Sequence, residues 1–128
     1  MKHGVVIAHG QLGQGVIDAA STIMGNIEGL SALSVTEMSV SEIHQRLNAL
    51  VANPAEGVDG IVLMACLRGG SSWNVSSAVA NDHKHVRVIS GVNLAMLLSF
   101  ITNRDRLDLD DLMQAMVVDS TKGIHLLA

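Results

Sequence analysis

The sequence predicts an α/β protein built on an open, doubly wound and mostly parallel sheet with helices on both faces. Two observations favour this fold. Short apolar runs alternate with segments of helical periodicity, and the links between them are short, which implies right-handed crossovers between parallel strands. The number of such units is also too small for a closed barrel of eight.

Short runs of apolar residues mark the expected strands. The first, Gly4 to Ala8, is apolar throughout and stops at His9-Gly10, as expected for a strand buried on both faces at the centre of its sheet. The tail from Gly123 to Ala128 is a plausible last strand. The other predicted strands are 32–35, 60–65 and 86–89.

Apolar residues at helical spacing, with start and stop signals, mark the expected helices. Gly25-Asn26 ends the first helix, and the second begins at a Ser39 or Ser41 cap and ends before Pro54. Aspartates near the start of the last helix suit the helix dipole. The apolar stripes run over 16–24, 43–51, 73–80, 94–101 and 109–117.

Composition limits the class of protein. The 128 residues fit a single domain, 1–128, and 48% apolar residues supply its core. A net charge of −4 and 2% aromatic residues argue against a nucleic-acid partner.

The sequence also predicts where the protein is found. One cysteine forms no internal disulfide, no run is long enough to span a bilayer, and no export signal is visible, so we expect a cytoplasmic protein. The histidines show no metal-ligand pattern, and His83 and His85 are expected in a solvated turn.

Three segments directly follow predicted strands: His9, Cys66 to Ser71, and Ser90 to Asn93. In open α/β sheets the ligand site lies beyond the carboxyl ends of the strands. We therefore expect these three segments to meet at one edge of the sheet.

His9 is the first candidate for chemistry. It ends a buried strand and precedes Gly10, and an imidazole nitrogen is nucleophilic at neutral pH and can carry a phosphoryl group. The position of His9 alone is also consistent with a histidine that only ends its strand and bonds its neighbours.

The turn Gly69-Gly70-Ser71-Ser72 is the second candidate. Backbone N–H groups at the start of the following helix could hold an anion, or the serines could simply cap that helix. The turn lacks the pattern of a nucleotide-binding loop, so ATP and NAD have no support.

Three ordered motifs resemble the mannose-family IIA domain of the bacterial sugar phosphotransferase system (PTS). They are Ile7-Ala8-His9-Gly10, the strand from Gly60 through Leu67 to Gly69-Gly70-Ser71 and Asn74, and Ser90-Gly91-Val92-Asn93-Leu94 with Met96-Leu97-Leu98. The resemblance implies four parallel strands in the order 2-1-3-4 and a last antiparallel strand exchanged within a homodimer. It also implies that His9 accepts a phosphoryl group from phosphorylated HPr and passes it to a IIB domain. This chemistry requires no cofactor. Since no run spans a bilayer, we expect a membrane to be involved only indirectly, through a partner transporter.

The chain departs from this family at Cys66, where members usually carry an aspartate that orients the histidine. A neutral thiol is a poorer acceptor. One alternative is therefore a IIA-like regulatory binding module with weak or lost transfer; another is a Cys/His enzyme that uses Cys66 as a thiolate. Arg68 replaces an aromatic residue and is either a phosphate ligand or a solvated loop residue.

The predicted site therefore has three parts. His9 and Cys66 carry the chemistry, and Arg68, Gly69, Gly70 and Ser71 bind phosphate. The partner-facing residues are Gly10, Ser72, Trp73 and Asn93, although Trp73 could equally pack on its own helix.

Overall fold

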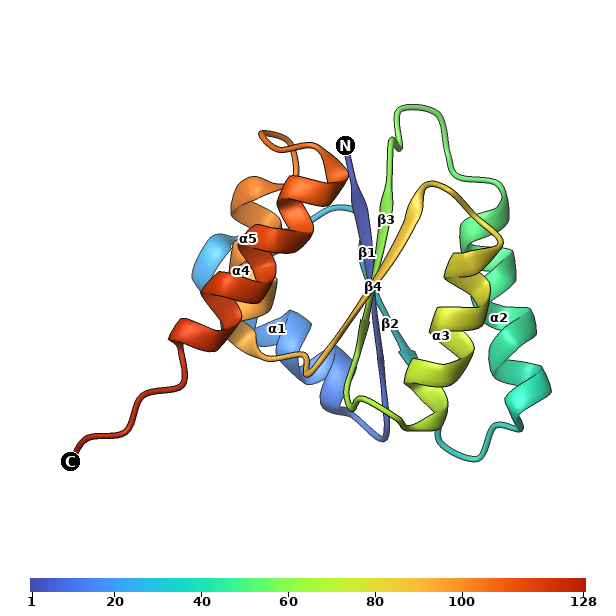
Figure 1. Cartoon of the computed structure of the whole chain (residues 1–128), viewed down its shortest axis with the longest axis horizontal. Coiled ribbons are helices and arrows are strands. Elements are labelled where there is room, and N and C mark those ends of the chain that lie inside the picture. Colours follow the sequence, from blue (N-terminus) through green and yellow to red (C-terminus); the bar gives the residue numbers. More distant parts are fainter.

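The computed structural model describes all 128 residues as strands and helices in alternation, followed by two consecutive helices and a short tail (Figure 1). The elements are β1 (His3–Ala8), α1 (Leu12–Met24), β2 (Leu30–Ser34), α2 (Val40–Ala52), β3 (Ile61–Ala65), α3 (Ser71–Asn81), β4 (Val86–Ser90), α4 (Leu94–Asn103) and α5 (Leu109–Lys122).

The four strands form one parallel sheet in the order β2-β1-β3-β4, which confirms the predicted order. The two central strands, β1 and β3, are apolar and buried almost from end to end. After β2 the chain crosses to the other side of β1 to form β3, so the direction in which strands are added reverses there. The switch point of the sheet therefore lies between β1 and β3. The pairing sets Ile7 beside Ala65 and Ala65 beside Ser90, so these strands end at one edge.

Helices cover both faces of the sheet, as predicted. Helices α2 and α3 lie on one face, and α1, α4 and α5 lie on the other (Figure 1). Because successive side chains of a strand point to opposite faces, Val5 and Ile7 join the core under α2 and α3, whereas Val6 joins the core under the other three helices. Two separate apolar cores therefore hold the sheet rigid from both sides.

The start of the second strand and the setting of two histidines differ from the sequence-based expectation. The second strand begins at Leu30 rather than residue 32, because Gly29 accepts a hydrogen bond from the Gly4 N–H and brings Leu30 into register with Gly4. His83 and His85 are half-buried rather than solvated: their Nε2 atoms lie 3.0 Å from Asn48 Oδ1 and 2.8 Å from the Val51 carbonyl oxygen. These two contacts hold the turn before β4 against helix α2.

The predicted last strand is not formed in this single chain. Residues 124–128 follow α5 without regular structure and extend away from the body of the molecule (Figure 1). The side chains of Ile124, Leu126 and Leu127 are 79%, 87% and 89% exposed. A strand forms only where its backbone groups pair with those of a neighbouring strand. Exchange of this segment with a second copy, which would supply that neighbour, stays a prediction.

Candidate functional site at the carboxyl edge of the sheet

Backbone hydrogen bonds continue past the ends of the strands and hold the loops at the carboxyl edge together. Cys66 N–H donates to the Ile7 carbonyl at 3.0 Å, and Val35 N–H donates to the Ala8 carbonyl at 3.0 Å. On the far side of β3, Val92 N–H donates to the Ala65 carbonyl at 3.2 Å. This ladder fixes where the residues that follow β1 and β3 lie.

The side chains of His9 and Cys66 meet at this edge. His9 Nδ1 lies 3.5 Å from Cys66 Sγ, and Ser72 Oγ lies 3.6 Å from the same sulfur. The imidazole makes no other hydrogen bond within the chain, and His9 is exposed. The ring is therefore held at Nδ1, and Nε2 is left without a protein partner.

The backbone beside His9 turns sharply. Gly10 has a φ of +56°, in the left-handed region that glycine adopts at little cost, and nothing would obstruct a side chain there. Its N–H donates to Thr36 Oγ1 at 2.7 Å, and Ser34 Oγ donates to the same oxygen at 3.2 Å. Thr36 was not among the predicted site residues, although it follows β2 at the same edge, where residues beyond the strand ends are expected to form the site.

The two helices that begin beside His9 and Cys66 lack side-chain caps. Helix α1 follows Gln11 and helix α3 follows Gly70, and neither residue makes a capping bond through its side chain. The other three helices are each capped by a side chain, from Ser39, Asn93 and Asp108. Since the first N–H groups of a helix have no intrahelical acceptor, this edge of the sheet presents free backbone donors and the positive ends of two helix dipoles.

The remaining predicted residues differ in exposure. Gly69 is exposed with a φ of +82°, Gly70 and Ser71 are partly exposed, and Arg68 is exposed and forms no ion pair or hydrogen bond within the chain. Trp73 is half-buried in the first turn of α3. The loop thus offers one free cation next to free backbone donors.

Two of the residues expected to contact a partner are engaged inside the fold. Asn93 Oδ1 accepts from the Met96 N–H at 2.8 Å, and its Nδ2 donates to the Ser120 carbonyl at 3.2 Å, so this amide caps α4 and ties it to α5. Ser72 is 0% exposed. Its burial does not fit the expected partner contact, because its hydroxyl faces the Cys66 sulfur instead.

No cavity of the molecule contains His9. A cavity of about 240 Å³ lies next to it, between Gly10, Gln11 and β2, and a larger one of about 320 Å³ lies near the opposite edge, beside His3 and Gly29. His9 therefore lies on an open surface rather than in a pocket.

No group of three or more His, Cys, Asp or Glu side chains is placed to hold a metal ion. No helix is both long and apolar enough to cross a membrane.

Fold and site together define a class: a doubly wound α/β domain that presents a histidine after a central strand, among free backbone donors. Within this class, residues 4–117 match the sequence model of the family EIIA-man, described as the PTS system fructose IIA component. The chain belongs to this family, the mannose family of PTS IIA components, which are phosphotransfer proteins of sugar transport.

Individual relatives agree with this assignment. The chain is 32% identical over 114 residues to the PTS sorbose-specific EIIA component of Klebsiella pneumoniae, covering 89% of this chain and 83% of that protein. It is 26% identical to the PTS mannose-specific EIIAB component of Escherichia coli, of which it spans 38% while 96% of its own length is matched. A crystal structure of the phosphotransferase system component EIIA from Streptococcus agalactiae superposes with a TM-score of 0.89 at 27% identity, covering 98% of this chain and 97% of that one.

Proposed function

We propose that this protein is a phosphocarrier that accepts a phosphoryl group on His9 Nε2 from phosphorylated HPr and passes it to a IIB domain in the cytoplasm. The observation that supports this most directly is the state of the imidazole. Nδ1 faces Cys66 at 3.5 Å, whereas Nε2 belongs to an exposed ring and has no partner. A nitrogen that is both unblocked and accessible is what a nucleophile in phosphoryl transfer needs.

The surroundings of His9 suit a phosphoryl group. As the new P–N bond to Nε2 forms, the donor's bond to phosphorus breaks, and Nδ1 keeps its hydrogen. The transferred oxygens would meet the backbone donors around Gly69, Gly70 and Ser71 at the start of α3, with the exposed Arg68 guanidinium as a counter-charge. Such donors are preorganised, since a rigid sheet and two helices hold them.

The open position of His9 favours proteins over small molecules as donor and acceptor. Sites for small molecules are concave and bury most of the ligand, but no cavity contains His9. A phosphorylated protein can instead bring its phosphoryl group to an exposed ring. The name of the Escherichia coli relative, EIIAB, supports a B component as the acceptor.

A reconstituted phosphorelay tests this proposal. The protein is mixed with enzyme I, HPr and phosphoenolpyruvate, and its intact mass is expected to rise by one phosphoryl group, ~80 Da. His9→Ala should abolish the gain, while His44→Ala, a matched change at an exposed histidine on α2, should leave it unchanged. A native protein that never gains this mass from phosphorylated HPr, or a His9→Ala variant that still does, would refute the carrier role.

A further inference from the structure

The loop after β2 holds the backbone on both sides of His9. Val35 N–H donates to the Ala8 carbonyl at 3.0 Å. Gly10 N–H donates to Thr36 Oγ1 at 2.7 Å. The first of these bonds holds the peptide group that precedes His9, and the second holds the peptide group that follows it. Because peptide groups are planar, holding both of them fixes φ and ψ of His9, and with them the direction of its Cα–Cβ bond.

The bond from Gly10 to Thr36 replaces a regular bond of the sheet. The parallel register of β1 and β2, continued beyond the strand ends, would direct the Gly10 N–H to the Val35 carbonyl. That carbonyl instead accepts from the Met38 N–H at 3.1 Å, within a tight turn. A side-chain oxygen of the loop therefore does what a backbone oxygen does elsewhere in the ladder.

The turn that presents Thr36 is strained. Glu37 has a φ of +61° and is the only residue other than glycine in the left-handed region. This conformation is uncommon for a residue with a side chain, and such strain is concentrated at functional sites, where the surrounding structure maintains it. The chain thus keeps an unfavourable backbone in the turn that brings Thr36 to Gly10.

Chemistry fixes the direction of the bond between Gly10 and Thr36. An amide N–H can only donate, so Thr36 Oγ1 is the acceptor. Ser34 Oγ also lies 3.2 Å from this oxygen, and both hydroxyl side chains are exposed. Whichever of the two hydroxyls donates to the other, the remaining hydroxyl hydrogen can bond to water, and the bond from Gly10 is unaffected.

We propose that Thr36 is a positioning residue for His9. Its hydroxyl holds the backbone from the side of β2, while Cys66 Sγ, 3.5 Å from Nδ1, faces the ring from the side of β3. Since backbone dihedrals decide which rotamers a side chain adopts, these contacts together keep the exposed ring in one orientation. The consequence for transfer rests on the proposed phosphocarrier function, because a reacting nitrogen must be aligned with the phosphorus that it attacks. The orientation itself is a property of the free protein.

Three variants separate positioning from other roles. Thr36→Val keeps the shape of the side chain but removes the hydroxyl, whereas Thr36→Ser keeps the hydroxyl. Thr22→Val is the matched control, because Thr22 is an exposed threonine of α1 whose hydroxyl donates to the Asp18 carbonyl of the same helix at 3.0 Å.

Nuclear magnetic resonance of the full-length protein, without any partner, gives the first readout. Thr36→Val should speed hydrogen exchange of the Gly10 amide by about two- to tenfold. The Hα–Hβ couplings of His9 should change from those of one rotamer towards an average over several. Thr36→Ser and Thr22→Val should leave both measurements unchanged. Unchanged Gly10 exchange in Thr36→Val, or faster exchange with unchanged His9 couplings, would overturn the proposal.

The rate of phosphoryl transfer gives the second readout. Thr36→Val should lower the maximal rate of transfer from phosphorylated HPr by about two- to tenfold without changing the HPr concentration at half-maximal rate, and Thr36→Ser should keep the native rate. A rise in that HPr concentration at an unchanged maximal rate would show a docking contact and overturn positioning. If the His9 couplings respond to Thr36→Val but the native protein never gains a phosphoryl group, the carrier function fails and the positioning role stands.

Discussion

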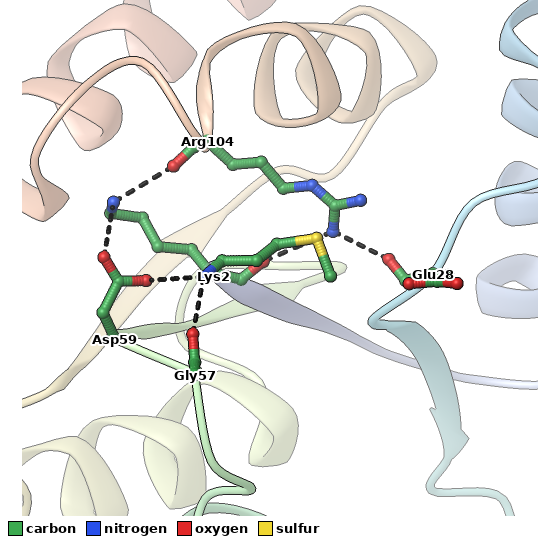
Figure 2. A network of polar contacts seen from close by, with 6 residues as sticks. Lys2, Glu28, Gly57, Asp59 and Arg104 are labelled. Atoms are coloured by element: carbon green, nitrogen blue, oxygen red, sulfur yellow. Dashed lines mark hydrogen bonds and ion pairs between the residues drawn. The ribbon is translucent and has the colours of Figure 1, made fainter.

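Lys2 and Arg104 hold each other's backbone, although 102 positions separate them in the chain: Lys2 Nζ donates to the Arg104 carbonyl at 3.0 Å, and Arg104 Nη1 donates to the Lys2 carbonyl at 3.3 Å (Figure 2). Arg104 also donates to the Glu28 carbonyl at 2.8 Å, and Lys2 Nζ lies 3.3 Å from Asp59 Oδ2. Both basic residues are buried. These contacts join the start of β1, the end of α4 and the loops before β2 and β3, so this end of the sheet depends on two buried cations.

Replacing Arg104 should destabilise the fold. Arg104→Met keeps much of the apolar stem but leaves the Lys2 and Glu28 carbonyls without their donor, at a cost of about 2–4 kcal/mol in the free energy of unfolding. Urea denaturation measures this loss. Arg46→Met, at an exposed arginine of α2 with no ion pair, should change stability by less than about 0.5 kcal/mol. Equal losses in the two variants would contradict a specific role for Arg104.

Asp59 should make stability depend on acid pH. Partial burial acts to raise the pKa of its carboxyl, but hydrogen bonds from Lys2 and the N-terminal amine prevail and hold that pKa below the ordinary 3.8. A carboxylate with a lowered folded-state pKa stabilises the protein above its unfolded pKa and loses this effect as the pH falls through the folded value. Asp59→Asn should therefore lower the melting temperature at neutral pH and make little difference at strongly acid pH. A constant difference across the whole pH range would contradict this linkage.

Restoring a carboxylate at position 66 should speed phosphorylation of His9. Cys66→Asp gives Nδ1–H a charged acceptor in place of a neutral sulfur, and charge-assisted hydrogen bonds are roughly twice as strong as neutral ones, so we expect a gain of about tenfold in the rate of transfer from phosphorylated HPr. Cys66→Asn, of similar size but uncharged, should give no such gain. A much larger gain would favour a regulatory binding module over an efficient carrier. No gain would contradict the prediction and would mean that the neutral thiol orients His9 as well as a carboxylate does.

The exposed tail should mediate self-association. Leu126→Glu places a charge within the apolar segment 124–128, and if this segment pairs with a second copy, the variant should be monomeric under conditions where the native protein is a dimer. Light scattering at micromolar concentration distinguishes the two states. Val40→Glu, at a residue that is 62% exposed on α2, should stay dimeric. A native protein that is already monomeric would count against exchange of the tail.

Much of the fold could be read from local patterns. The unbroken apolar run from Gly4 to Ala8 required a strand covered on both sides, and the helix bounds followed from spacing, caps and stops such as Ser39 and Gly25. These signals are local because a side chain's direction is set by its own backbone period. The order of the strands has no such local signal: it came from the resemblance to a family and is confirmed by the sheet.

The sequence by itself determined that His9 and Cys66 each follow a central strand, and hence that they face the same edge although they are 57 positions apart in the chain. Only the tertiary structure decided that Nδ1, rather than Nε2, faces the sulfur, and that Ser72 turns inward while Arg68 stays in solvent. The physical reason is that topology fixes where a strand ends, whereas the direction of a side chain beyond that end depends on the packing of loops and helix starts from distant parts of the chain.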